Sequence, residues 1–223
     1  MEVQWLGHAG VRISAEENTL FIDPSEMDYV GPDAKGVIDE LEPGDAILFT
    51  HGHDDHCASG TYKKLMKQGT VLIGPASCSD KVGASMRVMS PGDEMNVGPF
   101  SIKAVDAYNI KRERSPGTPF HPRGTGVGYV VTANGKSVYH AGDTEPIPEM
   151  RNTGPVDVAL IPVDGHFTMS AEEAAQVALV VRAGAFIPMH YFNTSIDQAI
   201  AAARAHEGLS THVLALGETY NIT

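Results

Sequence analysis

The 223-residue sequence predicts an α/β protein in which two β-sheets pack face to face and helices cover them. Short apolar runs typical of strands occur in an early and a late cluster, and helical patterns are interspersed in both halves of the chain. No linker separates the halves, because the Gly/Pro-rich stretches 31–36 and 115–128 have the character of loops. We therefore expect one domain spanning residues 1–223.

The strands are predicted from short apolar runs that turn residues delimit. In chain order these runs are 3–6, 11–14, 19–22, 46–49, 71–73, 100–105, 128–132, 137–139, 156–163, 185–188 and 213–216. The pair Asn134-Gly135 lies between two of them and is favoured in tight hairpin turns.

Three helices are predicted. The clearest covers residues 171–182, where Ser170 followed by Glu173 forms a capping-box pattern and Gly184 supplies a C-terminal stop. A second helix is expected over 195–206, and a third over 59–67, the latter ended by Gly69.

Composition limits the partners. A formal net charge of −12 argues against a nucleic-acid partner, because phosphate contacts require clustered Lys and Arg. The one basic cluster, residues 111–114 (Lys-Arg-Glu-Arg), is either a solvated loop or an anion-steering patch beside a site. No apolar run approaches the roughly 20 residues needed to cross a bilayer, and the N-terminus has no signal-peptide pattern. We therefore expect a cytoplasmic protein with no membrane partner.

The most informative run is residues 51–56, His-Gly-His-Asp-Asp-His, which follows the apolar strand 45–49. Imidazoles and carboxylates together suit zinc, and also manganese or iron. A polar surface loop is the alternative interpretation. A purification tag would be a terminal homopolymer, whereas this run is internal and mixed. The run therefore predicts a metal site at the end of a strand.

Two more candidate ligands follow predicted strands. Asp143 comes just after the strand 137–139, and His190 just after the strand 185–188. Taken singly, such an Asp is more often a turn or N-cap residue and such a His a satisfied polar residue. A shared metal would explain all three positions together.

These motifs resemble the metallo-β-lactamase-fold hydrolases, with His-x-His-x-Asp-His after one strand, Gly-Asp-Thr after another and a lone His after a late strand. Closer features resemble the ascorbate-phosphate-lactonase-like branch of small metal-dependent hydrolases, and they are residues 7–9, 22–24, 139–144, 167–169 and 188–191. The resemblance covers essentially the whole chain. It implies a four-layer αββα sandwich of two mixed sheets flanked by helices.

The resemblance also implies two divalent metal ions, most simply zinc, with manganese or iron as alternatives. The implied ligands are His51 and His53 for the first ion, Asp55, His56 and His190 for the second, and Asp143 between the two. Asp55 and Asp143 would also orient the attacking hydroxide.

One departure concerns the first ion. The wider superfamily supplies a third histidine from a strand end in the middle of the chain, and the matching segment here, residues 104–109, has none. Asp106 could replace it with a carboxylate oxygen. Alternatively, His121 on the next loop could be a ligand or a substrate contact. If neither binds, the site would work with one ion.

Two other histidines are candidates for the pocket. His8 could line the site or orient Asp23, or it could be a buried hydrogen-bonded turn residue. His166 could contact substrate, and either it or His121 could protonate the leaving group.

The implied activity is a metal-dependent hydrolysis in which a metal-bridged hydroxide attacks an ester, lactone or phosphodiester bond of a small, anionic metabolite. The alternatives are a metallo-nuclease or RNA-processing enzyme and a metal-binding protein without turnover. The expected partner is a small-molecule substrate, and the oligomeric state stays open between a monomer and a homo-oligomer.

Overall fold

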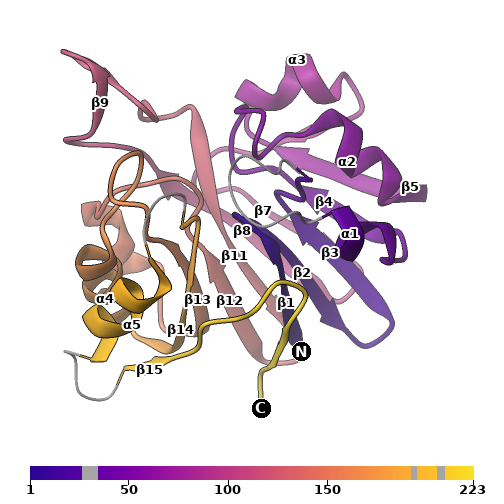
Figure 1. Cartoon of the computed structure of the whole chain (residues 1–223). Helices are drawn as coiled ribbons and strands as arrows, with labels where there is room; N and C mark the ends of the chain where they lie inside the picture. Colours follow the sequence, from indigo (N-terminus) through magenta and orange to yellow (C-terminus); the bar gives the residue numbers. More distant parts are fainter. Residues whose placement is uncertain (27–34, 192–194, 205–208) are drawn as a thin grey trace.

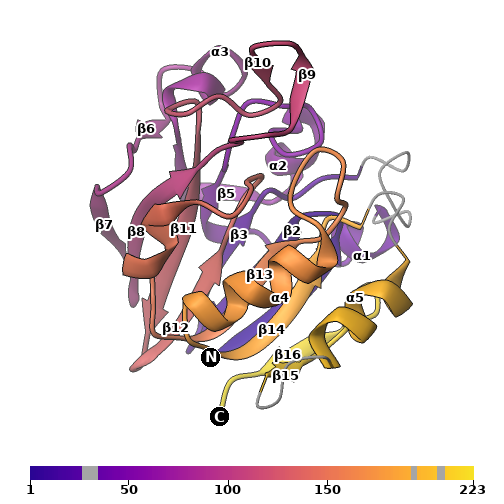
Figure 2. The ribbon, with the colours of Figure 1, turned by 90° about the vertical axis from the view of Figure 1, so that its left-hand side faces the viewer.

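The computed structural model describes residues 1–26, 35–191, 195–204 and 209–223. Within this part of the chain, two seven-stranded mixed sheets face each other and helices lie on their outer sides (Figure 1). The predicted four-layer αββα sandwich is confirmed. A view turned by 90° shows α4 and α5 lying across the outer side of the second sheet (Figure 2).

The first sheet has the order β16-β1-β2-β3-β4-β5-β6 and is antiparallel from β16 to β3 and parallel from β3 to β6. Its strands are β1 (Glu2–Gly7), β2 (Gly10–Ala15), β3 (Asn18–Ile22), β4 (Gly44–Leu48), β5 (Met66–Gly74), β6 (Arg87–Val88) and β16 (Thr219–Asn221). The helical segments on its side of the molecule are α1 (Lys35–Asp39), α2 (Ser59–Lys64), the 3₁₀ turn η2 (Ala76–Cys78) and α3 (Ser79–Val82).

The second sheet has the order β15-β14-β13-β12-β11-β8-β7, and β12 to β15 run parallel. Its strands are β7 (Glu94–Val97), β8 (Phe100–Ala107), β11 (Gly126–Ala133), β12 (Lys136–His140), β13 (Val156–Pro162), β14 (Ala183–Met189) and β15 (Ser210–Thr211). The helices on its side are the 3₁₀ helix η3 (Pro148–Asn152), α4 (Ala171–Val180) and α5 (Ile196–Arg204). Between β8 and β11, β9 (Glu113–Ser115) and β10 (Thr118–Pro119) form a separate small hairpin.

The core explains why the central strands have continuous apolar runs. In β4, Leu48 packs into the cluster between the sheets, whereas Ile47 packs into a second cluster on the outer face with α2 residues such as Tyr62. In β14, Ile187 faces inward and Phe186 packs outward with residues of α4. Strands buried on both faces lose the alternation of apolar and polar residues that a half-exposed strand shows.

The prediction of a strand over 213–216 is wrong. Residues 212–215 are irregular, and Glu218 closes a turn in which its backbone N–H donates to Ala215 O and its side chain accepts from Ala215 N. The sheet pairing comes instead from β15 before this segment and β16 after it.

The predicted hairpin turn is confirmed, since Asn134 and Gly135 connect β11 to β12 with φ of 53° and 72°. The capping box of α4 forms between Ser170 and Glu173 as predicted. The predicted stop is wrong, because Arg182 (φ 52°) takes the left-handed position and Gly184 already lies in β14.

Of the other two predicted helices, one is shorter than expected and the other begins one residue later, at Ile196. α2 ends at Lys64 rather than 67, since β5 begins at Met66. In the predicted helix 195–206, residues 205–206 lie outside the described residues.

The two sheets present their loops at a common edge. The segments after β4, β12 and β14 lie there, because the C-terminal ends of parallel strands meet at one edge of a sheet. The turn between β1 and β2 joins them, with His8 O accepting a hydrogen bond from His190 N at 3.0 Å. Chemistry-bearing residues from both halves of the chain therefore meet at this edge. Among the described residues, no helix is long and apolar enough to cross a membrane.

Candidate metal centre

A first group of potential ligands consists of His51, His53 and His121, whose ligand atoms lie within 4.8 Å of one another. His51 Nε2 and His53 Nδ1 are 2.9 Å apart, a contact that leaves both atoms facing the same point. The His121 ring is fixed from behind, since its Nδ1 lies 2.6 Å from Asn109 Oδ1. An Nδ1–H donated to that amide oxygen leaves His121 Nε2 as the free ligand atom.

A second group consists of His8, Asp55, His56 and His190, also within 4.8 Å of one another. Asp55 Oδ2 is 3.1 Å from His8 Nε2 and 3.7 Å from His56 Nε2. The structure thus brings His8 to the site itself, where it contacts Asp55 rather than Asp23.

Asp143 lies between the two groups. Its Oδ2 is 3.1 Å from His121 Nε2 and 3.2 Å from His190 Nε2, and its Oδ1 is 3.4 Å from His56 Nε2. The preceding Gly142 permits this placement, because it has a φ of 64° and a Cβ there would lie 2.8 Å from Val127 O. A single buried carboxylate therefore contacts imidazoles of both groups.

Two further carboxylates orient the ligand rings, and neither is among the predicted ligands. Asp23 Oδ2 lies 2.7 Å from His56 Nδ1, and Asp164 Oδ2 lies 3.0 Å from His190 Nδ1. Each contact directs the other ring nitrogen, Nε2, toward Asp143. Both aspartates directly follow a predicted strand, and that position is the signal that could have identified them.

Burial and charge set the protonation of the imidazoles. Burial, with His56 nearby, holds the pKa of His51 well below its usual value, and burial with His190 lowers the pKa of His8 to about 4. Burial would also lower the pKa of His190 and His56, but the facing carboxylates outweigh it, Asp143 with Asp164 for His190 and Asp143 with Asp55 and Asp23 for His56. The pKa of His190 rises to about 10, and that of His56 rises well above 6.5. Positive charge is therefore stabilised where Asp143 faces these two rings.

The buried polar atoms fit a metal cation. Among the described residues, neither His56 Nε2 nor Asp143 Oδ1 has a hydrogen-bond partner, although both are buried. Leaving such atoms unsatisfied is costly, and a cation bound between them would satisfy both. The donor set of imidazole nitrogens and carboxylate oxygens is the one that zinc, manganese and iron accept.

Three residues of the site have a strained backbone. His8, Asp23 and His190 adopt positive φ angles of 48°, 45° and 53°. Side-chain-bearing residues in the left-handed region persist only where surrounding contacts hold them, and they concentrate at functional sites.

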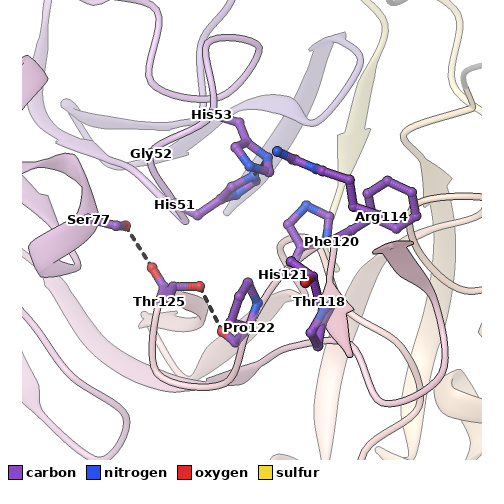
Figure 3. Close-up of a pocket in the computed structure, with 11 residues that line it drawn as sticks. His51, Gly52, His53, Ser77, Arg114, Thr118, Phe120, His121, Pro122 and Thr125 are labelled. Atoms are coloured by element: carbon purple, nitrogen blue, oxygen red, sulfur yellow. Dashed lines mark hydrogen bonds between the residues drawn. The ribbon is translucent and has the colours of Figure 1, made fainter. Parts of the chain in front are cut away.

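A cavity of about 360 Å³ opens beside the first group, within the size range of small-ligand sites (Figure 3). Its lining residues are His51, Gly52, His53, Ser77, Arg114, Thr118, Pro119, Phe120, His121, Pro122 and Thr125. The loop that carries the β9–β10 hairpin thus forms one wall, and the metal-ligand candidates form the other.

The structure does not bring Asp106 to either group. Asp106 lies on β8 and its Oδ1 is 3.9 Å from Arg123 Nε. Of the two alternatives for the third ligand of the first ion, the structure brings His121 and not Asp106 to His51 and His53. His121 N donates a hydrogen bond to Asn109 Oδ1 at 2.9 Å. This contact brings the loop that follows β8 back to the site, and His121 therefore lies there.

His166 also lies outside both groups. The Asp164 carboxylate accepts hydrogen bonds from the backbone N–H groups of His166 and Phe167, and this tight turn leaves His166 exposed. Its ring packs on Phe167 and Phe120 with centroid distances of 4.5 and 5.5 Å. The His166 ring therefore contacts Phe120, which lines the cavity, and does not contact the metal-ligand candidates.

Comparison with known proteins agrees with this geometry. The family model of the beta-lactamase superfamily domain matches residues 2–190. The UPF0173 metal-dependent hydrolase of Pyrococcus furiosus is 33% identical over 197 residues, covering 86% of this chain and 84% of its own.

Two crystal structures have the same fold. A protein of Parabacteroides distasonis assigned to the metal-dependent hydrolases is 29% identical, with a TM-score of 0.82, and the match covers 95% of this chain and 91% of that one. YhfI of Bacillus subtilis, a metallo-β-lactamase-fold protein, has a TM-score of 0.76 at 14% identity, with 99% of both chains covered. The chain therefore belongs to the beta-lactamase superfamily and is one of its metal-dependent hydrolases.

Proposed function

We propose that this hydrolase binds two divalent cations, zinc by preference, and cleaves an ester, lactone or phosphodiester bond of a small, anionic metabolite in the cytoplasm. The observation that carries the proposal is the position of Asp143, whose carboxylate contacts His121 of one group and His56 and His190 of the other. A carboxylate that lies between two ligand groups is suited to bridge two ions.

The ligand candidates form two sets, one for each proposed ion. His51, His53 and His121 would hold the first ion, and His8, Asp55, His56 and His190 the second, with Asp143 shared. When bound, the two ions would supply Lewis acidity and a water of lowered pKa. Asn109, Asp23 and Asp164 hold ligand imidazoles from behind, so that their Nε2 atoms stay aimed at the site without reorganisation.

The cavity supports a small substrate. It opens on the His51, His53 and His121 side, and Phe120 and Pro122 give it apolar walls. A volume of about 360 Å³ is at the small end of the range for ligand sites, which favours a metabolite over a polymer. The resemblance of residues 7–9, 22–24, 139–144, 167–169 and 188–191 to the ascorbate-phosphate-lactonase-like branch supports such a substrate.

The deciding experiment is metal content per chain, measured by plasma mass spectrometry. The protein is purified without chelator or nickel affinity, reloaded with zinc, manganese or iron(II), and assayed on 4-nitrophenyl esters, a lactone, bis(4-nitrophenyl) phosphate and a single-stranded RNA. Two tightly held ions with turnover would support the proposal. One ion would require a mononuclear mechanism, and two ions with no turnover on any of these would favour metal binding without catalysis. Turnover of RNA alone would favour the nuclease alternative.

A further inference from the structure

The cavity beside the first ligand group has an unusual charge for this protein. The chain has 28 acidic residues and a net charge of −12, yet no Asp or Glu is among the residues that line the cavity. Apart from histidines, its one charged lining residue is Arg114. Among the residues that line the cavity, the one permanent charge is therefore positive, opposite in sign to the protein as a whole.

Arg114 occupies a special place on the β9–β10 hairpin. Ser115 pairs with Thr118 and Glu113 pairs with Pro119, so that Arg114 is the extra, unpaired residue of a β-bulge. A bulge redirects the side chain that it carries and recurs next to active sites. Figure 3 shows the Arg114 side chain extending from the hairpin toward His53, across the cavity.

The neighbouring arginines form ion pairs with glutamates, whereas the Arg114 guanidinium is available to bind a ligand. Arg112 Nη1 lies 2.5 Å from Glu145 Oε1, and Arg123 Nη2 lies 2.6 Å from Glu149 Oε1. Within the described ranges, Arg114 forms no ion pair with any carboxylate. An exposed arginine without a partner is ordinary on a surface. Here it is directed by a bulge into a cavity without acidic residues, next to the ligand candidates.

We propose that Arg114 is the specificity-determining residue that binds the anionic group of the substrate, a carboxylate or a phosphate, while the scissile bond lies at the metal centre. The planar guanidinium matches both groups through paired hydrogen bonds. Phe120 and Pro122 add apolar walls to the same cavity, which suits a substrate with a short carbon skeleton between its anionic group and the bond that is cleaved. This inference rests on the proposed hydrolysis and narrows its substrate class.

A pair of matched esters tests the inference in the zinc-loaded enzyme. 4-Nitrophenyl hydrogen glutarate carries a terminal carboxylate, and 4-nitrophenyl valerate has the same chain length without it. For Arg114→Ala we expect kcat/KM on the glutarate ester to fall by about ten- to a hundredfold, mainly through KM, because hydrogen bonds to a charged group are lost. The valerate ester should be turned over within about twofold of the wild type.

Two further variants separate specific binding from general charge. Arg114→Lys should recover only part of the loss, since it keeps the charge without the paired geometry. Lys111→Ala removes an exposed positive charge from the same loop, and its side chain does not line this cavity. It should leave both esters unaffected. Equal losses on both esters in Arg114→Ala, or no loss on either, would overturn the inference.

A binding measurement makes the inference independent of turnover. Calorimetry would titrate glutarate and 4-phosphonobutyrate into the zinc-loaded wild type and Arg114→Ala. Weaker binding of either anion to the variant supports the role of Arg114. If the wild type binds neither anion, or the variant binds them equally well, Arg114 has no such role. If neither ester is cleaved while binding still depends on Arg114, the proposed ester hydrolysis is contradicted and the proposed anion site is supported.

Discussion

His190 Nδ1 lies 3.0 Å from Asp164 Oδ2, on the opposite side of the imidazole from the atom that faces the metal centre. Asp164 thereby faces the second ring nitrogen of this ligand candidate and, together with the hydrogen bond from His190 N to His8 O, supports the orientation of the ring. Asp164→Asn should lower the affinity for the second ion by about ten- to a hundredfold, the usual effect of losing such a partner. Competition with a fluorescent zinc chelator measures it, and an unchanged affinity would remove Asp164 from this role.

Asp143→Ala should reduce turnover by about three orders of magnitude, comparable to the loss of a donor that stabilises the transition state. The protein should still fold, with unchanged far-UV circular dichroism, since the substitution removes no apolar core contact. Asp54→Ala is the matched control, because Asp54 belongs to the same histidine-rich run but is exposed and pairs with Lys81. Full activity in Asp143→Ala would contradict the bridging role.

His121→Ala and Asp106→Ala distinguish the two candidates for the third ligand of the first ion. His121 Nε2 lies 3.1 Å from Asp143, whereas Asp106 lies beside Arg123. We therefore expect His121→Ala to retain one ion per chain and Asp106→Ala to retain two, as measured by plasma mass spectrometry after gel filtration. The reverse pattern would show that the loop rearranges when metal binds.

Glu145 gives the metal-free protein a pH-dependent stability. Burial would raise its pKa, but backbone N–H donors from Lys111 and neighbours and the Arg112 guanidinium outweigh it, so the pKa lies below the usual 4.5. The carboxylate therefore contributes stability above pH 4.5, and the contribution is lost as the pH falls through the folded-state pKa. Glu145→Gln should cost about 1–3 kcal/mol at pH 7, and less at acidic pH. Urea unfolding with chelator at pH 7, 4 and 3 tests this, and a constant difference would contradict it.

Removing the metal should destabilise the protein more than the loss of a surface ion would. The ligand candidates come from both sheets, His8 and His51 from the first and Asp143 and His190 from the second. A bound ion therefore cross-links the two layers. At a hundredfold excess of metal over its Kd, the expected gain is about 2.7 kcal/mol per site. Thermal unfolding with and without chelator measures it, and equal midpoints would mean that the layers do not depend on the ions.

The fold and the ligand candidates nearest to strands were predictable because their signals are local. A buried strand followed by His-x-His-x-Asp-His specifies position and chemistry within about a dozen residues. Asp143 and His190 could be added because each follows its own strand.

The choice between Asp106 and His121 could not be made from the sequence. It depends on the path of the loop between β8 and β11, which Glu145 holds by accepting the backbone N–H groups of residues 110–112. The orienting carboxylates Asp23 and Asp164 were missed for a similar reason, since each is far in sequence from the ring that it contacts. The bulge at Arg114 depends on a hairpin register that no apolar pattern encodes.

The left-handed backbone at His8, Asp23 and His190 means that the site gives up some backbone stability to place these side chains. Glycine would suit all three positions better, and each strained residue costs roughly 1 kcal/mol or more. Substitution of any of the three by glycine would relieve this strain but would remove a ligand candidate or, at Asp23, an orienting carboxylate. The backbone is therefore strained at the very positions where the two halves of the sandwich meet.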